Sequence, residues 1–162
     1  MNLRVVGRDP KLTSLHRALT CIFPDILFIK ETMVEEVKAR ALVTKVLPNW
    51  YCCGIDSIGR SGGLCVAWNP TKLSLVLFYT CAGILLNGTL HEGNQMITLI
   101  NYYDPCTDRR VFWDTVFNSG ILDTKNLILA RDLKFTVSAS EVWGSKARLG
   151  PLAEYFKETF RD

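Results

Sequence analysis

Several common functional signatures are missing from this sequence of 162 residues. Its six cysteines form no C-x-x-C pair, which excludes the usual structural zinc motifs. It carries no glycine-rich nucleotide motif, so a small-molecule α/β enzyme of the nucleotide-binding kind has no support. Its net charge is only +3, too small for a nucleic-acid coat protein but compatible with a local basic groove.

Segments that would direct the chain to a membrane or out of the cell are also missing. The N-terminus begins Met1-Asn2-Leu3-Arg4 and lacks the apolar run of a signal peptide. We therefore expect free thiols in a reducing intracellular compartment, with the adjacent Cys52 and Cys53 on opposite faces of a strand. One stretch without charge, residues 73–90, is rich in strand formers and has a turn signal at 81–83. It predicts two strands and no membrane partner.

Apolar periodicity and turn residues predict an α/β (α+β) fold. Helices are expected at 10–22, 34–46, 108–118 and 151–160. Strands are expected at 26–29, 51–55, 64–68, 73–79, 84–90, 96–102 and 127–130. The glycine-rich segment 59–63 predicts a turn between the second and third of these strands. Short connections between neighbouring strands indicate hairpin pairing, with helices flanking the sheets.

Three polar residues come directly after, or close behind, apolar strands. Glu31 follows the first strand, Tyr103 follows the strand at 96–102, and Asp132 follows the strand at 127–130. Ligands of α/β sheets bind outside the carboxyl ends of strands, and two carboxylates with a phenol could hold magnesium through oxygen atoms. A bound metal would polarise a phosphate or lower the pKa of a water molecule. The spacing alone also fits strand ends that simply meet solvent.

Six segments, in order along nearly the whole chain, carry a family resemblance. They are 2–4 (NLR), 24–32 (PDILFIKET), 59–64 (GRSGGL), 100–105 (INYYDP), 110–113 (RVFW) and 132–136 (DLKFT). Through them the chain resembles the endonuclease/exonuclease/phosphatase superfamily, in particular the endonuclease domain of plant LINE-type (non-LTR) retrotransposons. The resemblance implies a partial four-layer α/β sandwich, with two mainly antiparallel sheets flanked by helices and the C-terminal strands missing. Residues 1–162 would then form a single incomplete domain.

The resemblance also implies a magnesium-dependent phosphodiesterase that nicks DNA. Glu31 matches the main magnesium ligand of the family's Q-E-T motif, with Lys30 in place of the glutamine. Asn2 matches the asparagine of the opening W-N-x-R-G motif, which lies near the metal. Tyr103 matches the site tyrosine, and Asp132 matches the aspartate of G-D-x-N that orients or activates the attacking water. In a LINE element this nick primes reverse transcription in the nucleus, and the reverse transcriptase portion is absent here.

Departures from the family pattern imply weakened chemistry. The glycine and the asparagine of G-D-x-N are Arg131 and Lys134 here. Lys134 would bring a cation next to the two expected carboxylates, which disfavours metal binding. The two histidines of the chain match no catalytic histidine of the family. We therefore expect a remnant that is catalytically impaired or inactive. The alternatives are a folded remnant that binds nucleic acid weakly without catalysis, and an active DNA-nicking nuclease.

Lys134→Asn is expected to tighten magnesium binding, because the substitution removes a positive charge from the expected metal site. Titration of magnesium into the wild-type and variant proteins at the same ionic strength measures the difference. An unchanged affinity would contradict the expectation.

Overall fold

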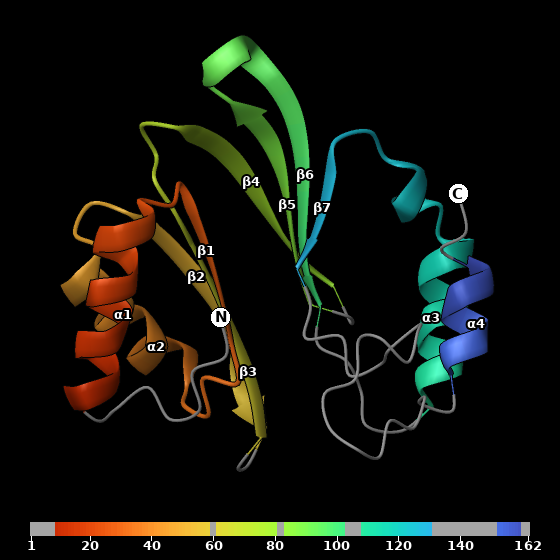
Figure 1. Cartoon of the computed structure of the whole chain (residues 1–162), viewed down its shortest axis with the longest axis horizontal. Helices are drawn as coiled ribbons and strands as arrows, with labels where there is room; N and C mark the ends of the chain where they lie inside the picture. Colours follow the sequence, from red (N-terminus) through yellow and green to blue (C-terminus); the bar gives the residue numbers. More distant parts are fainter. Residues whose placement is uncertain (1–8, 59–60, 81–82, 103–107, 131–151, 160–162) are drawn as a thin grey trace.

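The computed structural model describes residues 9–58, 61–80, 83–102, 108–130 and 152–159. These residues form four layers in the order helix, sheet, sheet, helix (Figure 1). The first sheet and its helices are built from α1 (Asp9–Ile22), β1 (Ile26–Lys30), α2 (Glu36–Val46), β2 (Tyr51–Ile58) and β3 (Ser61–Trp68). The second half holds β4 (Leu73–Thr80), β5 (Gly83–Leu90), η1 (Glu92–Asn94), β6 (Gln95–Tyr102), α3 (Arg109–Asn118), η2 (Ile121–Asp123), β7 (Leu127–Ala130) and α4 (Ala153–Thr159).

The two sheets have the strand orders β1-β3-β2 and β4-β5-β6-β7. All pairs are antiparallel except β6 with β7, which is parallel. In Figure 1, α1 and α2 cover the outer side of the first sheet, and α3 and α4 lie beyond the second. The predicted arrangement of two mainly antiparallel sheets flanked by helices is confirmed.

Five strands, which are β1, β2, β4, β6 and β7, end on the same side of the sandwich, because β2 runs antiparallel to β3 as β1 does. β4 and β6 both run antiparallel to β5, and β7 runs parallel to β6. β1 runs antiparallel to β3, whose chain reverses into β4, so β1 points the same way as β4 (Figure 1). We call this side, where Lys30, Tyr102 and Ala130 end their strands, the carboxyl end of the sandwich.

Successive side chains of each strand point to opposite faces of its sheet, and the apolar ones form three separate cores. Leu27 and Ile29 of β1 pack toward α1 and α2, while Ile26 and Phe28 pack toward the second sheet. The core between the two sheets is the most continuous. Its fully or almost fully buried members are Cys53, Leu64, Val66, Trp68, Leu73, Ile84, Leu86 and Leu99. The third core, between the second sheet and α3 with α4, is built around Trp113 and Phe156, which are both 0% exposed.

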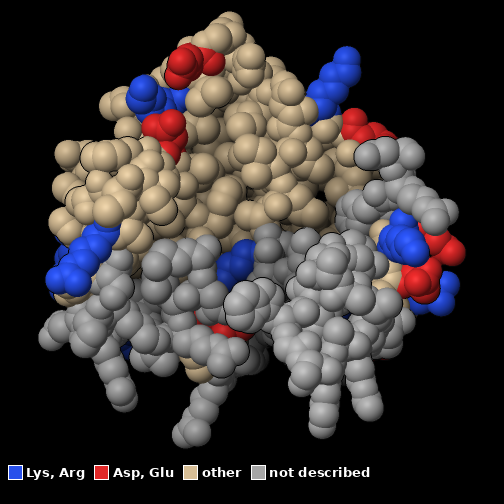
Figure 2. Space-filling view, viewed as in Figure 1, with Lys and Arg blue, Asp and Glu red and all other residues tan. Residues whose placement is uncertain are grey.

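The uncharged stretch at 73–90 forms β4 and β5, as predicted. These strands pair over their whole length, from Leu73 opposite Leu90 to Thr80 opposite Gly83. Figure 2 shows a broad uncharged surface over this part of the sandwich. Among the described residues, no helix is long and apolar enough to cross a membrane.

The turn predicted at 59–63 is shorter than expected. Ser61, Gly62 and Gly63 belong to β3, and both glycines have φ near +79°. The N–H groups of Thr32 and Met33 donate to the carbonyls of Gly63 and Gly62, so the chain after β1 lies directly against them. A Cβ at position 63 would overlap the Thr32 hydroxyl. Gly63 is therefore required by close approach rather than by a turn.

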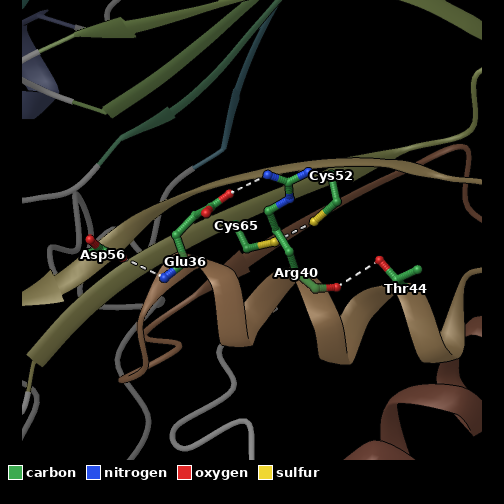
Figure 3. A network of polar contacts seen from close by, with 6 residues as sticks. All are labelled: Glu36, Arg40, Thr44, Cys52, Asp56 and Cys65. Atoms are coloured by element: carbon green, nitrogen blue, oxygen red, sulfur yellow. Dashed lines mark hydrogen bonds and ion pairs between the residues drawn. The ribbon is translucent and has the colours of Figure 1, made fainter.

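A polar network fixes the start of α2 against the first sheet (Figure 3). Glu35, at the N-cap, makes no side-chain capping bond. Asp56 of β2 takes over this function, because its Oδ1 accepts a hydrogen bond of 2.6 Å from the N–H of Glu36. Glu36 in turn forms an ion pair with Arg40 at 3.3 Å. A carboxylate at this position also interacts favourably with the helix dipole.

The thiols of Cys52 and Cys65 form a close pair on the helix side of the first sheet, with their sulfurs 3.1 Å apart. Hydrogen bonding from Cys65 lowers the pKa of the Cys52 thiol, whereas the same bond and burial raise that of Cys65. Cys53 faces the opposite side, as predicted, and burial raises its pKa to about 12. All four described cysteines, which are Cys21, Cys52, Cys53 and Cys65, are free thiols.

Asp56→Ala is expected to lower the free energy of unfolding by about 1 kcal/mol, the usual effect of losing an N-terminal helix cap. Urea denaturation followed by circular dichroism measures the change. Glu158→Ala provides the control, since Glu158 is an exposed carboxylate on α4. Equal stability losses in the two variants would show that Asp56 does not cap α2.

Cys52 is expected to be alkylated at a lower pH than an ordinary thiol, because its lowered pKa populates the thiolate earlier. Peptide-resolved mass spectrometry after short iodoacetamide pulses gives the rate at each pH. Cys65→Ala removes the hydrogen-bond donor, so the profile of Cys52 should move to higher pH. Cys53→Ala, on the other face, should leave it in place. A Cys52 profile unaffected by Cys65→Ala would refute the pairing.

Candidate functional site

Glu31 lies at the carboxyl end of β1 on a β-bulge. Lys30 is opposite Leu64, but the next residue along β3, Gly63, accepts its hydrogen bond from Thr32. Glu31 is therefore an extra residue, and its φ of +51° lies in the left-handed region. Such a conformation costs a non-glycine residue roughly 1–3 kcal/mol. Bulges of this kind re-aim side chains next to active sites, so the strand end is shaped to present Glu31 differently from an ordinary strand residue.

The chain after the bulge is held firmly. Thr32 is only 1% exposed, and its hydroxyl donates to the carbonyl of Val34. The same carbonyl accepts a bond from the N–H of Ser57 on β2. Because α2 is capped from the same strand, two neighbouring contacts with β2 fix this segment. The position of Glu31 is thus determined by β3 on one side and β2 on the other.

Lys30 is buried, with 8% of its surface exposed. It shares strand parity with Ile26 and Phe28, so it faces the second sheet rather than the helices. A buried ammonium group is costly unless other groups compensate its charge. Lys30 therefore lies at the carboxyl end of the inter-sheet core, directly before Glu31 in the sequence.

Asn101 is a second polar group buried at this end. It lies on β6 opposite Ile84 and Ala130 and is 0% exposed. It shares parity with Leu99, which belongs to the inter-sheet core. Neither its Oδ1 nor its Nδ2 has a hydrogen-bond partner in the part of the chain that the structure describes. An unsatisfied buried amide costs about 1–3 kcal/mol of folding free energy.

Of the four predicted site residues, the described structure includes only Glu31. Asn2, Tyr103 and Asp132 lie outside the described residues, as do Arg131 and Lys134. The strands that precede Tyr103 and Asp132 do end at the same side as β1. The grouping of all four residues stays a prediction.

The described donors do not by themselves make a magnesium site. Within ranges 9–58, 61–80, 83–102, 108–130 and 152–159, no three acidic, cysteine or histidine side chains come together. Magnesium takes a nearly octahedral set of oxygen ligands, and Glu31 is the one predicted ligand that the described residues include. The described residues therefore supply one carboxylate of the predicted magnesium set.

The start of α3 also lies near the carboxyl end (Figure 1). Arg110 lies over the ring of Tyr155, 5.5 Å from its centroid. The hydroxyl of Tyr155 donates to Asp114 at 2.6 Å, and partial burial together with this bond raises its pKa to about 12. Arg110 thus contributes to the contact between α3 and α4.

Lys30 and Asn101 were not identified as site residues from the sequence. The sequence does contain a signal for each of them. Both are polar residues in an apolar run, at a position whose alternate neighbours along the strand are core residues. A hollow lined by Leu90, Met96, Ile97 and Ile128 among others lies at the start of β6 and β7. It is therefore at the opposite end from Glu31.

Comparisons with known proteins agree with this architecture. No family model and no curated protein matches the sequence. Among solved structures, the chain is similar to the AP endonuclease LMAP from Leishmania major, with a TM-score of 0.70 and 12% identity over 98% of this chain and 63% of that one. It is similar to the endonuclease domain of TRAS1, a telomere-specific non-LTR retrotransposon, with a TM-score of 0.64 and 14% identity over 98% and 68%.

A third similar structure is ANGEL2, described as a 2′,3′-cyclic phosphatase, with a TM-score of 0.56 and 15% identity over 90% of this chain and 47% of that one. The chain spans just under two thirds of the Leishmania enzyme and slightly more than two thirds of the TRAS1 domain. Identities this low establish the fold and leave the activity open. The chain has the fold of the AP endonucleases and non-LTR retrotransposon endonucleases, which is that of the endonuclease/exonuclease/phosphatase superfamily.

Proposed function

We propose that the chain is a remnant of a magnesium-dependent DNA endonuclease domain from a LINE-type retroelement, with impaired or no catalytic activity. The observation that carries this proposal is the bulge at the carboxyl end of β1, which takes Glu31 out of the regular pairing with β3 and gives it a φ of +51°. Strained residues of this kind cluster at active sites. The position matches the residue that the sequence resemblance assigns as the main metal ligand.

Substrate and reaction follow from the fold and the sequence motifs together. The similar structures include an AP endonuclease and a retrotransposon endonuclease domain. In the proposed site, Glu31 and Asn2 would hold the magnesium ion, Tyr103 would be the site tyrosine of the family, and Asp132 would orient or activate the attacking water. The bound magnesium would supply Lewis-acid stabilisation of the phosphodiester. The nucleic acid partner is DNA, bound weakly.

Impairment follows from cations at positions where the reaction needs neutral groups. Lys134 and Arg131 replace the asparagine and glycine of the aspartate motif. Lys30 adds a buried positive charge next to Glu31. Each cation competes with magnesium for the same carboxylates. A weak metal site in a folded domain is the expected result.

Two-dimensional amide NMR of the full chain, with and without magnesium, tests the proposal. We expect dispersed peaks and small magnesium-dependent shifts that include Glu31 and its neighbours Lys30 and Thr32. Glu31→Gln should abolish these shifts while keeping the dispersion, because the amide loses the charge but keeps the size of the side chain. Plasmid nicking in magnesium should stay at the background seen without protein.

Two results would contradict the proposal in different ways. Rapid nicking by the wild-type chain that Glu31→Gln abolishes would show an active nuclease rather than an impaired one. Magnesium shifts that persist in Glu31→Gln would exclude Glu31 as the ligand. Glu92→Gln is the matched control, since Glu92 lies in η1 at the other end of the sandwich. It should leave every magnesium-dependent shift unchanged.

A further inference from the structure

We infer that Cys52 and Cys65 form a dithiol site that hydroperoxides oxidise to a reversible intramolecular disulfide. Cys52 would be the attacking thiol, and Cys65 would be the resolving thiol that closes the link. The inference does not depend on the proposed function, because it uses no residue of the predicted magnesium set. It concerns the helix side of the first sheet, where Cys65 belongs to the apolar core and Cys52 packs against it.

The two sulfurs are already close to bonding distance. They lie 3.1 Å apart, and both residues are free thiols. A disulfide bond is about 2.05 Å long, so each sulfur has to move by only about half an ångström. Figure 3 shows the two side chains pointing toward one another across the hairpin of β2 and β3. Closing the link therefore requires little rearrangement of the hairpin.

The register of the hairpin explains this approach. Cys52 is opposite Ala67 on β3. Cys65 is opposite Gly54 on β2, which makes the two cysteines diagonal neighbours on one face of the sheet. Because Gly54 carries no side chain, no group directly opposite Cys65 on β2 separates its sulfur from that of Cys52. A Cβ at position 54 would also come within 2.9 Å of Cγ of Glu36, so α2 packs closely over this part of the hairpin.

The two thiols differ in the way that the reaction requires. Cys52 is half-buried, so a small oxidant can reach it, whereas Cys65 is completely buried. The hydrogen bond from Cys65 lowers the pKa of the Cys52 thiol against the effect of burial. On α2, the guanidinium of Arg40 lowers this pKa further and the carboxylate of Glu36 opposes it. The same hydrogen bond and burial raise the pKa of Cys65. Cys52 is therefore the thiol that becomes the nucleophilic thiolate.

The other described cysteines lack this arrangement of exposure and contact. Cys53 follows Cys52 directly but faces the inter-sheet core, where burial raises its pKa to about 12. Cys21 is exposed on α1, on a different element. An exposed thiol and a buried thiol in the same molecule thus provide internal references for the reactivity of Cys52.

The oxidation proceeds through a sulfenic acid. The thiolate of Cys52 attacks one oxygen of the hydroperoxide, the O–O bond breaks, and the other oxygen leaves and takes a proton from solvent. The hydroperoxide is thereby reduced to water or an alcohol. The sulfur of Cys65 next attacks the sulfur of Cys52, the S–O bond breaks, and the hydroxyl leaves as water with the proton of Cys65. A dithiol reductant reverses the link by thiol–disulfide exchange.

Hydrogen peroxide added in equimolar amount to the reduced full chain tests the inference. Free thiols are then blocked in acid, and the peptides are identified by mass spectrometry. We expect free Cys52 and Cys65 to be lost together as one linked peptide pair, which dithiothreitol releases. Cys21 and Cys53 should stay free. The same treatment in concentrated urea is the control, because unfolding separates the two sulfurs and should remove the preference for this pair.

Substitutions separate the roles of the two thiols. In Cys65→Ala, Cys52 should oxidise more slowly and stop at the sulfenic acid, which dimedone labels. In Cys52→Ala, Cys65 should stay reduced, because its thiol is buried. Cys53→Ala is the matched control, since it removes the neighbouring cysteine on the opposite face, and the link should form at the wild-type rate.

Mapping of the wild-type chain alone decides whether the link forms. Oxidation of Cys21 before Cys52 would overturn the inference. So would further oxidation of Cys52 to the sulfinic acid without a link, because Cys65 would then not act as a resolving thiol. A Cys52–Cys65 link that forms equally fast in urea would show that the folded hairpin does not create the site. Magnesium binding and nicking are not involved in any of these outcomes, so the proposed function is tested separately.

Discussion

The apolar interface between the two sheets is the constraint on which the rest of the structure depends. Leu64, Val66, Leu86 and Leu99 are almost completely buried there, and each strand contributes every second side chain. Once these residues face inward, the face of the sheet on which the last residue of each strand lies is fixed. The ends of β1, β6 and β7 then meet at one side of the molecule. The candidate site is a consequence of how this core is filled.

Polar residues at that interface conflict with the packing that surrounds them. Asn101 is completely buried, and Glu31 adopts a backbone conformation that favours glycine. Each departure opposes folding by about 1–3 kcal/mol, against a typical total stability of roughly 5–15 kcal/mol. Conflicts between local preference and the global fold are expected at functional sites. Other residues of the described structure also have positive φ, among them Asn49, Asn94 and Asn126, so the strain at Glu31 gains meaning only together with its place at a strand end.

Patterns of apolar residues were sufficient to predict most of the fold. Short runs such as 26–29 and the alternation around Cys52 and Cys53 carry their own period, so element types and faces follow from local sequence. The bulge at Glu31 could not be predicted, because it arises from hydrogen bonds between Thr32 and a glycine about 30 positions away. The predicted length of the turn at 59–63 was wrong for the same reason. Gly62 and Gly63 look like turn residues until the neighbouring strand is placed against them.

The sequence predicted a site residue only where a family motif includes that position. Glu31 was found because a family pattern covers it, whereas Lys30 looked like a simple replacement of a glutamine. Its burial depends on the second sheet, which no local pattern around position 30 reveals. The same holds for Asn101, whose cost becomes visible only when β5 and β7 enclose it on both sides.

Lys30 and Glu31 show how one strand end can serve opposite charges. In a regular strand the side chain after Lys30 would point to the helix side, and the bulge takes Glu31 out of this alternation. Lys30 keeps the inward parity of β1, and Glu31 leaves the regular pleat. The regular pleat of β1 thus places Lys30, whereas hydrogen bonds from the following residues to Gly62 and Gly63 of β3 place Glu31.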